Sequence, residues 1–140
     1  MQVVLDMREK ELEERQMEMA KILSALNAQR EKLQGIISDQ DKNKNELESL
    51  CISENMDIEQ VQAHREFGIK LIQDAKNQER IILNTESILE KKQQEVLEAH
   101  QKVEILKKLK EKQEKEYYNE FLQSEMKEID DITSARFRIN

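Results

Sequence analysis

The fold is decided by residues 5–47, which read LDMREKELEERQMEMAKILSALNAQREKLQGIISDQDKNKNEL. Every seventh position from Leu5 is apolar except Gln40, and the row consists of Leu5, Leu12, Met19, Leu26, Leu33, Gln40 and Leu47. A repeat of seven residues keeps these side chains on one side of an α-helix that packs against a partner helix. The stretch therefore predicts one long helix with a coiled-coil seam.

A second row with the same step follows later in the chain: Val61, Gly68, Ala75, Ile82, Leu89, Val96 and Val103. Between the two rows lies CISENMDIEQ, residues 51–60. Asp57 can cap a following helix, and Gln60 three residues later completes a pattern like a capping box. This pattern predicts a turn between two helices.

The two rows pair in one antiparallel register when the chain folds back at Glu54, because the residue numbers of every pair then sum to 108. Leu26 pairs with Ile82, Leu5 with Val103, and Gln40 with Gly68. Heptads on both helices also allow a register shifted by seven residues. We predict an all-α antiparallel coiled-coil hairpin that forms a single domain over residues 1–140, with a first helix at about 3–52, a turn at about 53–57 and a second helix at about 58–136.

The first helix has a second inward row with fewer apolar residues. In this row Ile22, Ile36 and Leu50 alternate with the polar residues Arg15, Gln29 and Asn43. The weakest segment is Ser38–Glu46, SDQDKNKNE, which has no apolar side chain. We expect this segment to be loosened or bent but not to form a loop, since Leu33 and Leu47 stay in phase.

The predicted second helix is longer than the first by roughly 30 residues, so its C-terminal part has no partner within the chain. That part carries four of the five aromatic residues of the sequence. Tyr118, Leu122, Met126, Ile129 and Ile132 follow at steps of three and four, which places them on one side of a helix. An unpaired helix with an apolar stripe usually marks an interaction site. The alternative is a solvated amphipathic tail.

Charges are sorted along the same helix. Residues 107–115 carry a net charge of +3, residues 116–131 carry −5, and Arg136 and Arg138 follow near the end. Over the whole chain 38% of residues are charged, with no Pro and two Gly, which favours long helices over a globular core. The net charge of −7 argues against nucleic acid as a partner.

The sequence indicates no enzyme, cofactor or metal site. Gly35 and Gly68 stand alone and form no phosphate loop. His64 and His100 are interpreted as residues at the edge of the seam, and Cys51 as a small apolar filler near the turn. No apolar run approaches the ~18 residues of a membrane span, and the N-terminus has no signal-peptide pattern. A single cysteine fits the reducing cytoplasm.

Three segments resemble the FliJ family of flagellar export proteins: QVVLDMREKELEERQ at the start, MDIEQVQAHREFGIKLI after the turn, and KVEILKKLKEKQEKEYYNEF with EMKEIDDITSARF at the end. The C-terminal run is the most specific of the three. Family members usually begin several residues earlier with a basic, aromatic lead-in, which this sequence lacks.

The resemblance implies a non-enzymatic cytoplasmic component of the flagellar type III export apparatus, peripheral to the inner membrane. Its partners would be the hexameric export ATPase, which its terminal end enters and stimulates, the cytosolic domain of the export gate, and export chaperones. The ATPase-facing residues would be Tyr117, Tyr118, Phe121, Leu122, Met126, Ile129, Ile132, Arg136 and Phe137. The gate-facing residues would be Phe67, Leu71 and Ile36.

Two alternatives stay open at this point. One is the related stalk protein of an injectisome, which shares the hairpin. The other is a scaffold or tethering coiled coil without an ATPase partner.

Overall fold

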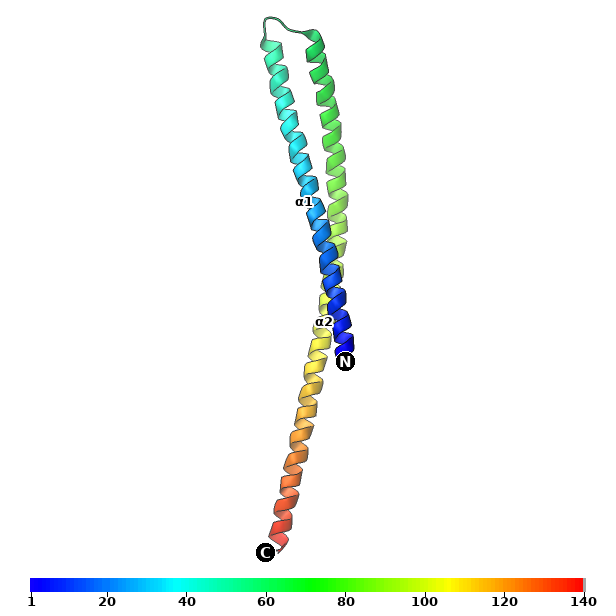
Figure 1. The fold of residues 1–140 in the computed structure, drawn as a ribbon, viewed down its shortest axis with the longest axis vertical. Helices are drawn as coiled ribbons and strands as arrows, with labels where there is room; N and C mark the ends of the chain where they lie inside the picture. Colours follow the sequence, from blue (N-terminus) through cyan, green and yellow to red (C-terminus); the bar gives the residue numbers. More distant parts are fainter. Residues whose placement is uncertain (140) are drawn as a thin grey trace. The chain divides into compact units, whose positions relative to one another are not determined.

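Two helices make up the chain, as the sequence predicts. The computed structural model describes the backbone of residues 1–139 and the side chains of residues 1–138. Helix α1 spans Gln2–Ile52 and helix α2 spans Ile58–Ile139, and no strand occurs within these residues (Figure 1). The absence of Pro and the abundance of Glu, Lys, Gln and Leu, which are strong helix formers, explain why both helices run without a break. The predicted all-α hairpin is confirmed.

The turn ends α1 and starts α2 by local hydrogen bonds. The amide of Ser53 donates to the carbonyl of Ser49 across 3.2 Å, which closes the last turn of α1. Asp57 caps α2, because its carboxylate accepts a hydrogen bond from the Glu59 amide at 3.0 Å. A reciprocal side-chain bond from Gln60 is not found among the described residues, so the cap is a simple one.

The chain has two compact parts. The first comprises Arg15–Val96, in which α1 and α2 lie side by side and run antiparallel on either side of the turn (Figure 1). Its buried apolar residues include Leu26, Leu71 and Ile82. The second part comprises Met1–Glu14 and the chain from Leu97 onward. There Leu5 and Val103 are buried, and Lys110 donates a hydrogen bond to the Gln2 side chain.

Hydrogen bonds across the first part fix the register. The Asn43 amide donates to the backbone carbonyl of His64 at 2.9 Å, and the Gln78 amide donates to the carbonyl of Gln29 at 2.9 Å. In both pairs the residue numbers sum to 107, one less than the predicted sum of 108. The structure therefore has the predicted register and not the one shifted by seven.

The inner faces also contain charged residues. Lys92 contacts Glu18 at 3.1 Å and Glu95 at 3.2 Å, and Arg15 contacts the same two carboxylates at 3.6 and 3.2 Å. The hydrogen bond and the charge of Lys92 lower the pKa of Glu18, and the hydrogen bonds that Lys92 donates to Glu18 and Glu95 raise the pKa of Lys92. An ion-pair network thus takes the place of an apolar layer, as the polar residue Arg15 in the thin row suggested.

Helix α1 runs through Ser38–Glu46 without forming a loop, as expected, and Asn43 within this segment turns inward and bonds to α2. Two expectations need correction. The residue that reaches Gly68 is Asn43 and not Gln40, since a Cβ at Gly68 would meet the Asn43 amide nitrogen at 3.0 Å. Cys51 is exposed and fills no apolar space, because it follows the last inward residue of α1, the half-buried Leu50.

Candidate functional site: an unpartnered helix with an apolar stripe

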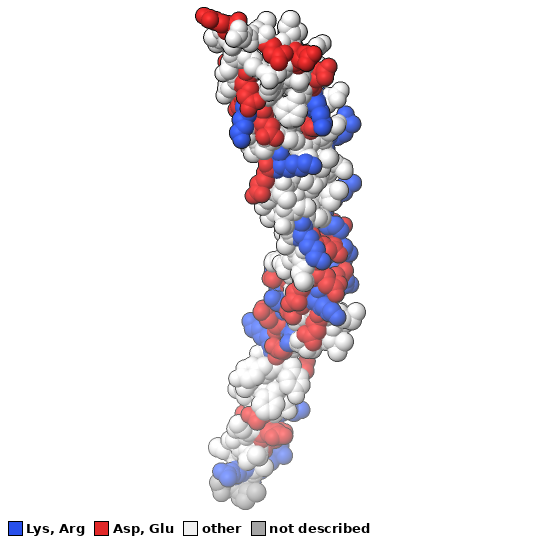
Figure 2. All heavy atoms as spheres, turned by 45° about the horizontal axis from the view of Figure 1, so that its top comes forward, with Lys and Arg blue, Asp and Glu red and all other residues white. Residues whose placement is uncertain are grey.

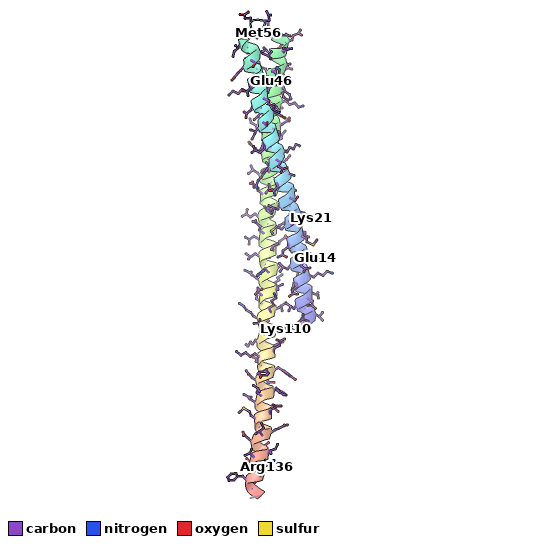
Figure 3. The ribbon with its side chains drawn as sticks, turned by 60° about the vertical axis from the view of Figure 1, so that its left-hand side comes forward. Glu14, Lys21, Glu46, Met56, Lys110 and Arg136 are labelled. Carbon is purple, nitrogen blue, oxygen red and sulfur yellow. The ribbon has the colours of Figure 1, made fainter. Side chains whose placement is uncertain are left out.

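The C-terminal part of α2 has no intramolecular cover. All residues from 111 to 138 are exposed, and the predicted aromatic and aliphatic residues are 39% to 85% exposed. Figure 3 shows side chains on all sides of α2 between the labelled residues Lys110 and Arg136, with no second helix beside them. These exposed apolar residues, called here the stripe, are Tyr117, Tyr118, Phe121, Leu122, Met126, Ile129, Ile132 and Phe137.

The stripe does not continue the hairpin seam. The inward rows of α2 include Ala99, Val103 and Leu106, and at about 100° per residue the centre of the stripe lies roughly 100° around the helix from them. Extending those rows by steps of seven gives Lys110, Gln113, Tyr117, Glu120, Ser124, Lys127, Asp131 and Ser134, of which only Tyr117 is apolar. A helix packed along the extended seam would therefore leave most of the stripe in water. The sequence is suited to a partner that approaches from another side.

The stripe is framed by unneutralised charge. Residues 116–131 keep their net charge of −5, since no ion pair involves residues 111–138 in the described part of the chain. Thr133 does not compete for a partner, because its hydroxyl donates to the Ile129 carbonyl at 2.8 Å within the same helix. In the space-filling view, uncharged side chains gather on the faint C-terminal part of α2 between charged ones (Figure 2).

The predicted gate-facing residues do not share one surface. Phe67 is 47% exposed, whereas Leu71 is only 5% exposed and packs inside the hairpin, and Ile36 is half-buried. Phe67 and Leu71 are four residues apart, but Leu71 belongs to the inward row of α2 that also contains His64 and Gln78. Its burial makes Leu71 a core residue, so Phe67 is the surface residue of the three.

A polar layer that the sequence reasoning missed lies beside Phe67. The His64 ring nitrogen Nδ1 lies 2.8 Å from the Asn43 side-chain oxygen and 3.7 Å from the Glu46 carboxylate. Asn43 and Gln78 are the buried polar residues of the hairpin, at 7% and 4% exposed. The signal in the sequence was the step of seven from His64 through Leu71 to Gln78, a second row on α2 with too few apolar members to stand out.

Of the remaining chemical candidates, His100 is exposed on α2. No group of three or more His, Cys, Asp or Glu side chains suited to a metal ion occurs in residues 1–138. None of the described helices is long and apolar enough to cross a membrane.

These features define a class of protein: a two-helix antiparallel coiled coil whose second helix ends in an unpaired, amphipathic segment. The family described as "Flagellar FliJ protein" matches residues 1–140, the whole chain. The chain belongs to the FliJ family, and it is thus a component of the flagellar type III export apparatus. No curated protein and no solved structure matches the chain.

Proposed function

We propose that this chain is a non-enzymatic cytoplasmic protein whose C-terminal stripe inserts into the hexameric export ATPase and stimulates it. The observation that supports the proposal is the exposed stripe on an α2 segment that lacks a partner among the described residues. Burying a large apolar side chain contributes ~1.5–3 kcal/mol, so five such side chains can outweigh the cost of ordering and association.

The charge bands set the chemistry of the partner. Residues 116–131, which contain most of the stripe, carry a net charge of −5 and fit a basic surface of the partner. Residues 107–115 carry +3 and fit an acidic surface of the same partner. Such complementary bands orient the helix along its axis. Because these charges are exposed, the association should weaken with salt.

Stimulation would follow from differential binding. A single asymmetric helix in the axis of a ring meets its subunits in different conformations at the same time. It can shift the balance between those conformations only by binding one of them more tightly than another. The chain therefore needs no catalytic residue of its own.

The test compares two double variants of the full chain. Leu122→Ser with Ile129→Ser removes two stripe side chains, and the matched control Gln113→Ser with Gln123→Ser changes two polar residues off the stripe. The first should raise the concentration for half-maximal ATPase stimulation at least about tenfold, a loss of ~1.4 kcal/mol or more. The control should leave it unchanged.

Thermal unfolding separates binding from folding. Because the stripe is exposed, both double variants should stay within about 0.5 kcal/mol of the wild type. Normal stimulation by the stripe variant, together with early melting of its hairpin, would show that the stripe belongs to the protein's own core. The proposal would then be wrong.

The gate contact is proposed for Phe67, at the turn-proximal end. It is supported by the exposed aromatic ring of Phe67, whereas Ile36 is half-buried and offers less surface. Phe67→Ala alone is the clean test, because Leu71→Ala would also remove a buried core side chain at a cost of ~2–5 kcal/mol. We expect Phe67→Ala to weaken binding to the cytosolic domain of the export gate and to spare ATPase stimulation. Equal loss of both activities would refute a separate gate surface.

We also propose that the chain escorts export chaperones, as its family membership suggests. Co-purification from flagellated cells, compared between wild type and the stripe variant, tests whether chaperones and ATPase use the same surface. Chaperone recovery that does not depend on the presence of this chain would contradict the escort role.

A further inference from the structure

A groove with basic edges runs beside the turn-proximal half of the hairpin, apart from both the stripe and Phe67. It encloses about 430 Å³, and its apolar lining consists of Leu47, Gly68, Ile69 and Ile72. Ile69 and Ile72 are 61% and 50% exposed, although neighbouring apolar residues of the seam are covered. Large apolar side chains that flank a hollow are the usual mark of a protein-binding surface.

Gly68 accounts for the hollow. A Cβ at this position would lie 3.0 Å from the Asn43 amide nitrogen, so a side chain here would press on the amide that is hydrogen-bonded to His64. The seam therefore has no apolar side chain from α2 in this layer. The Asn43 amide occupies the space in front of Gly68, and the groove lies beside this layer with Gly68 in its lining.

Charge distinguishes this groove from its neighbours. Lys44 and Arg65 line it, and no carboxylate does. A neighbouring hollow beside Phe67 is lined by two carboxylates and one ammonium group, those of Asp39, Glu46 and Lys42. Neither Lys44 nor Arg65 forms an ion pair within the described residues. The groove thus presents two unneutralised cations beside an apolar floor.

We propose that this groove binds an acidic amphipathic helix of another protein. Apolar side chains of that helix would enter the hollow over Gly68 and pack against Ile69 and Ile72. Carboxylates on the same helix would meet Lys44 and Arg65. An amphipathic helix that lays its apolar face into a groove, with complementary charge at the rim, is a common mode of recognition. This inference does not rest on the proposed function, which uses other surfaces.

The probe is a labelled helical peptide of about 18 residues, or five turns, with Leu at steps of three and four and Glu at the flanking positions. A matched peptide carries Lys in place of every Glu. Fluorescence anisotropy with the full chain should show saturable binding of the acidic peptide. The lysine peptide should bind at least about tenfold more weakly, a difference of ~1.4 kcal/mol.

Two variants locate the site. Ile69→Ser with Ile72→Ser should weaken binding of the acidic peptide at least about tenfold. The control Ile81→Ser with Leu83→Ser changes two exposed apolar residues outside the groove and should have no effect. Circular dichroism verifies that both variants keep the helix content of the wild type.

Charge reversal decides the chemistry. Lys44→Glu with Arg65→Glu should abolish binding of the acidic peptide and confer binding of the lysine peptide. Equal binding of both peptides by the wild type, or no effect of the Ile69 and Ile72 changes, would overturn the proposal. The proposal would also be overturned if the wild type self-associates and the charge reversal abolishes that self-association. The acidic C-terminal segment of a second copy would then be the occupant.

Discussion

The two buried amides should hold the helices in register. If α2 slides by seven residues, Leu26 faces Leu89, Asn43 faces Leu71, and Gln78 faces Ile36. The apolar rows tolerate this shift, since each row repeats every seven residues. The amides do not tolerate it, because Asn43 would lose the His64 ring and meet the Cβ of Ala75 in place of Gly68, and the Gln78 amide would meet the β-branched Ile36 in place of Gln29.

The size of the effect follows from burial. Asn43 and Gln78 are 7% and 4% exposed, and a buried polar group left without a partner costs about 1–3 kcal/mol. Two such groups disfavour the shifted register by about 2–6 kcal/mol, a factor of about 30 to 10⁴. Replacing both by Leu removes the penalty, while Gly68 leaves room for the larger side chain at position 43. The double variant Asn43→Leu with Gln78→Leu should fold but populate both registers.

Cysteine pairs report the register in a Cys51→Ser background. Cysteines at 26 and 82 should bridge on mild oxidation in the wild-type hairpin. Cysteines at 26 and 89 should not, being one heptad or ~10 Å out of line. In the double Leu variant the second pair should gain bridging, detected on non-reducing gels.

The matched control is Asn27→Leu with Gln73→Leu, which makes the same changes at two exposed positions. It should keep the wild-type pattern of bridges. If the buried double variant also keeps that pattern, then the apolar rows and the turn alone set the register, and the role given to the two amides is wrong.

Three further predictions test the hairpin. Because the pKa of Glu18 is lowered, its contribution to stability is full above the ordinary carboxylate value of 4.5 and is lost as pH falls through the lowered pKa. The pKa of Lys92 is raised, so its contribution persists until pH rises above 10.5. The Tm difference between wild type and Lys92→Met should therefore shrink from pH 7 to pH 3, and an unchanged difference would contradict the ion-pair network. Leu26→Ala should destabilise the chain by about 2–5 kcal/mol, against about 0.5 kcal/mol for the more exposed Leu23→Ala, as measured by urea unfolding; equal costs would contradict the assigned seam. Cys51 should react with iodoacetamide in the native protein nearly as fast as in urea, and strong native protection would contradict its exposed position.

The helices were predictable, and the register was narrowed to positions seven residues apart, because both depend on repeated local patterns. Seven-residue rows from Leu5 and Val61, together with the Asp57 cap, were enough to place both helices and the turn. The exposure of the stripe was predictable for the same reason, since a longer second helix must extend past the first.

The interior of the hairpin was harder to predict because it depends on which polar side chains turn inward. Asn43 looked like part of a weak segment, but in the structure it is a buried partner of His64. Leu71 looked like a surface residue beside Phe67, because the row that contains it is mostly polar. In the structure it is buried. Pairwise hydrogen bonds between helices leave no period in a single sequence, so only the structure could assign these residues.

The stripe's own helix sets a limit on how the chain can meet its partner. Beyond residue 110 no tertiary contact supports α2 among the described residues, so its helicity depends on propagation from the packed hairpin. Lys, Glu and Gln near Glu114 favour that propagation, whereas Ile, Asp and Thr between Ile129 and Thr133 favour it less. We therefore expect order to decrease along the stripe, with Tyr118 and Leu122 ready to dock and Phe137 ordered on binding. Ordering the last turns of α2 costs conformational free energy, which the contacts of Phe137 and its neighbours must exceed. The first half of the stripe should therefore carry most of the affinity.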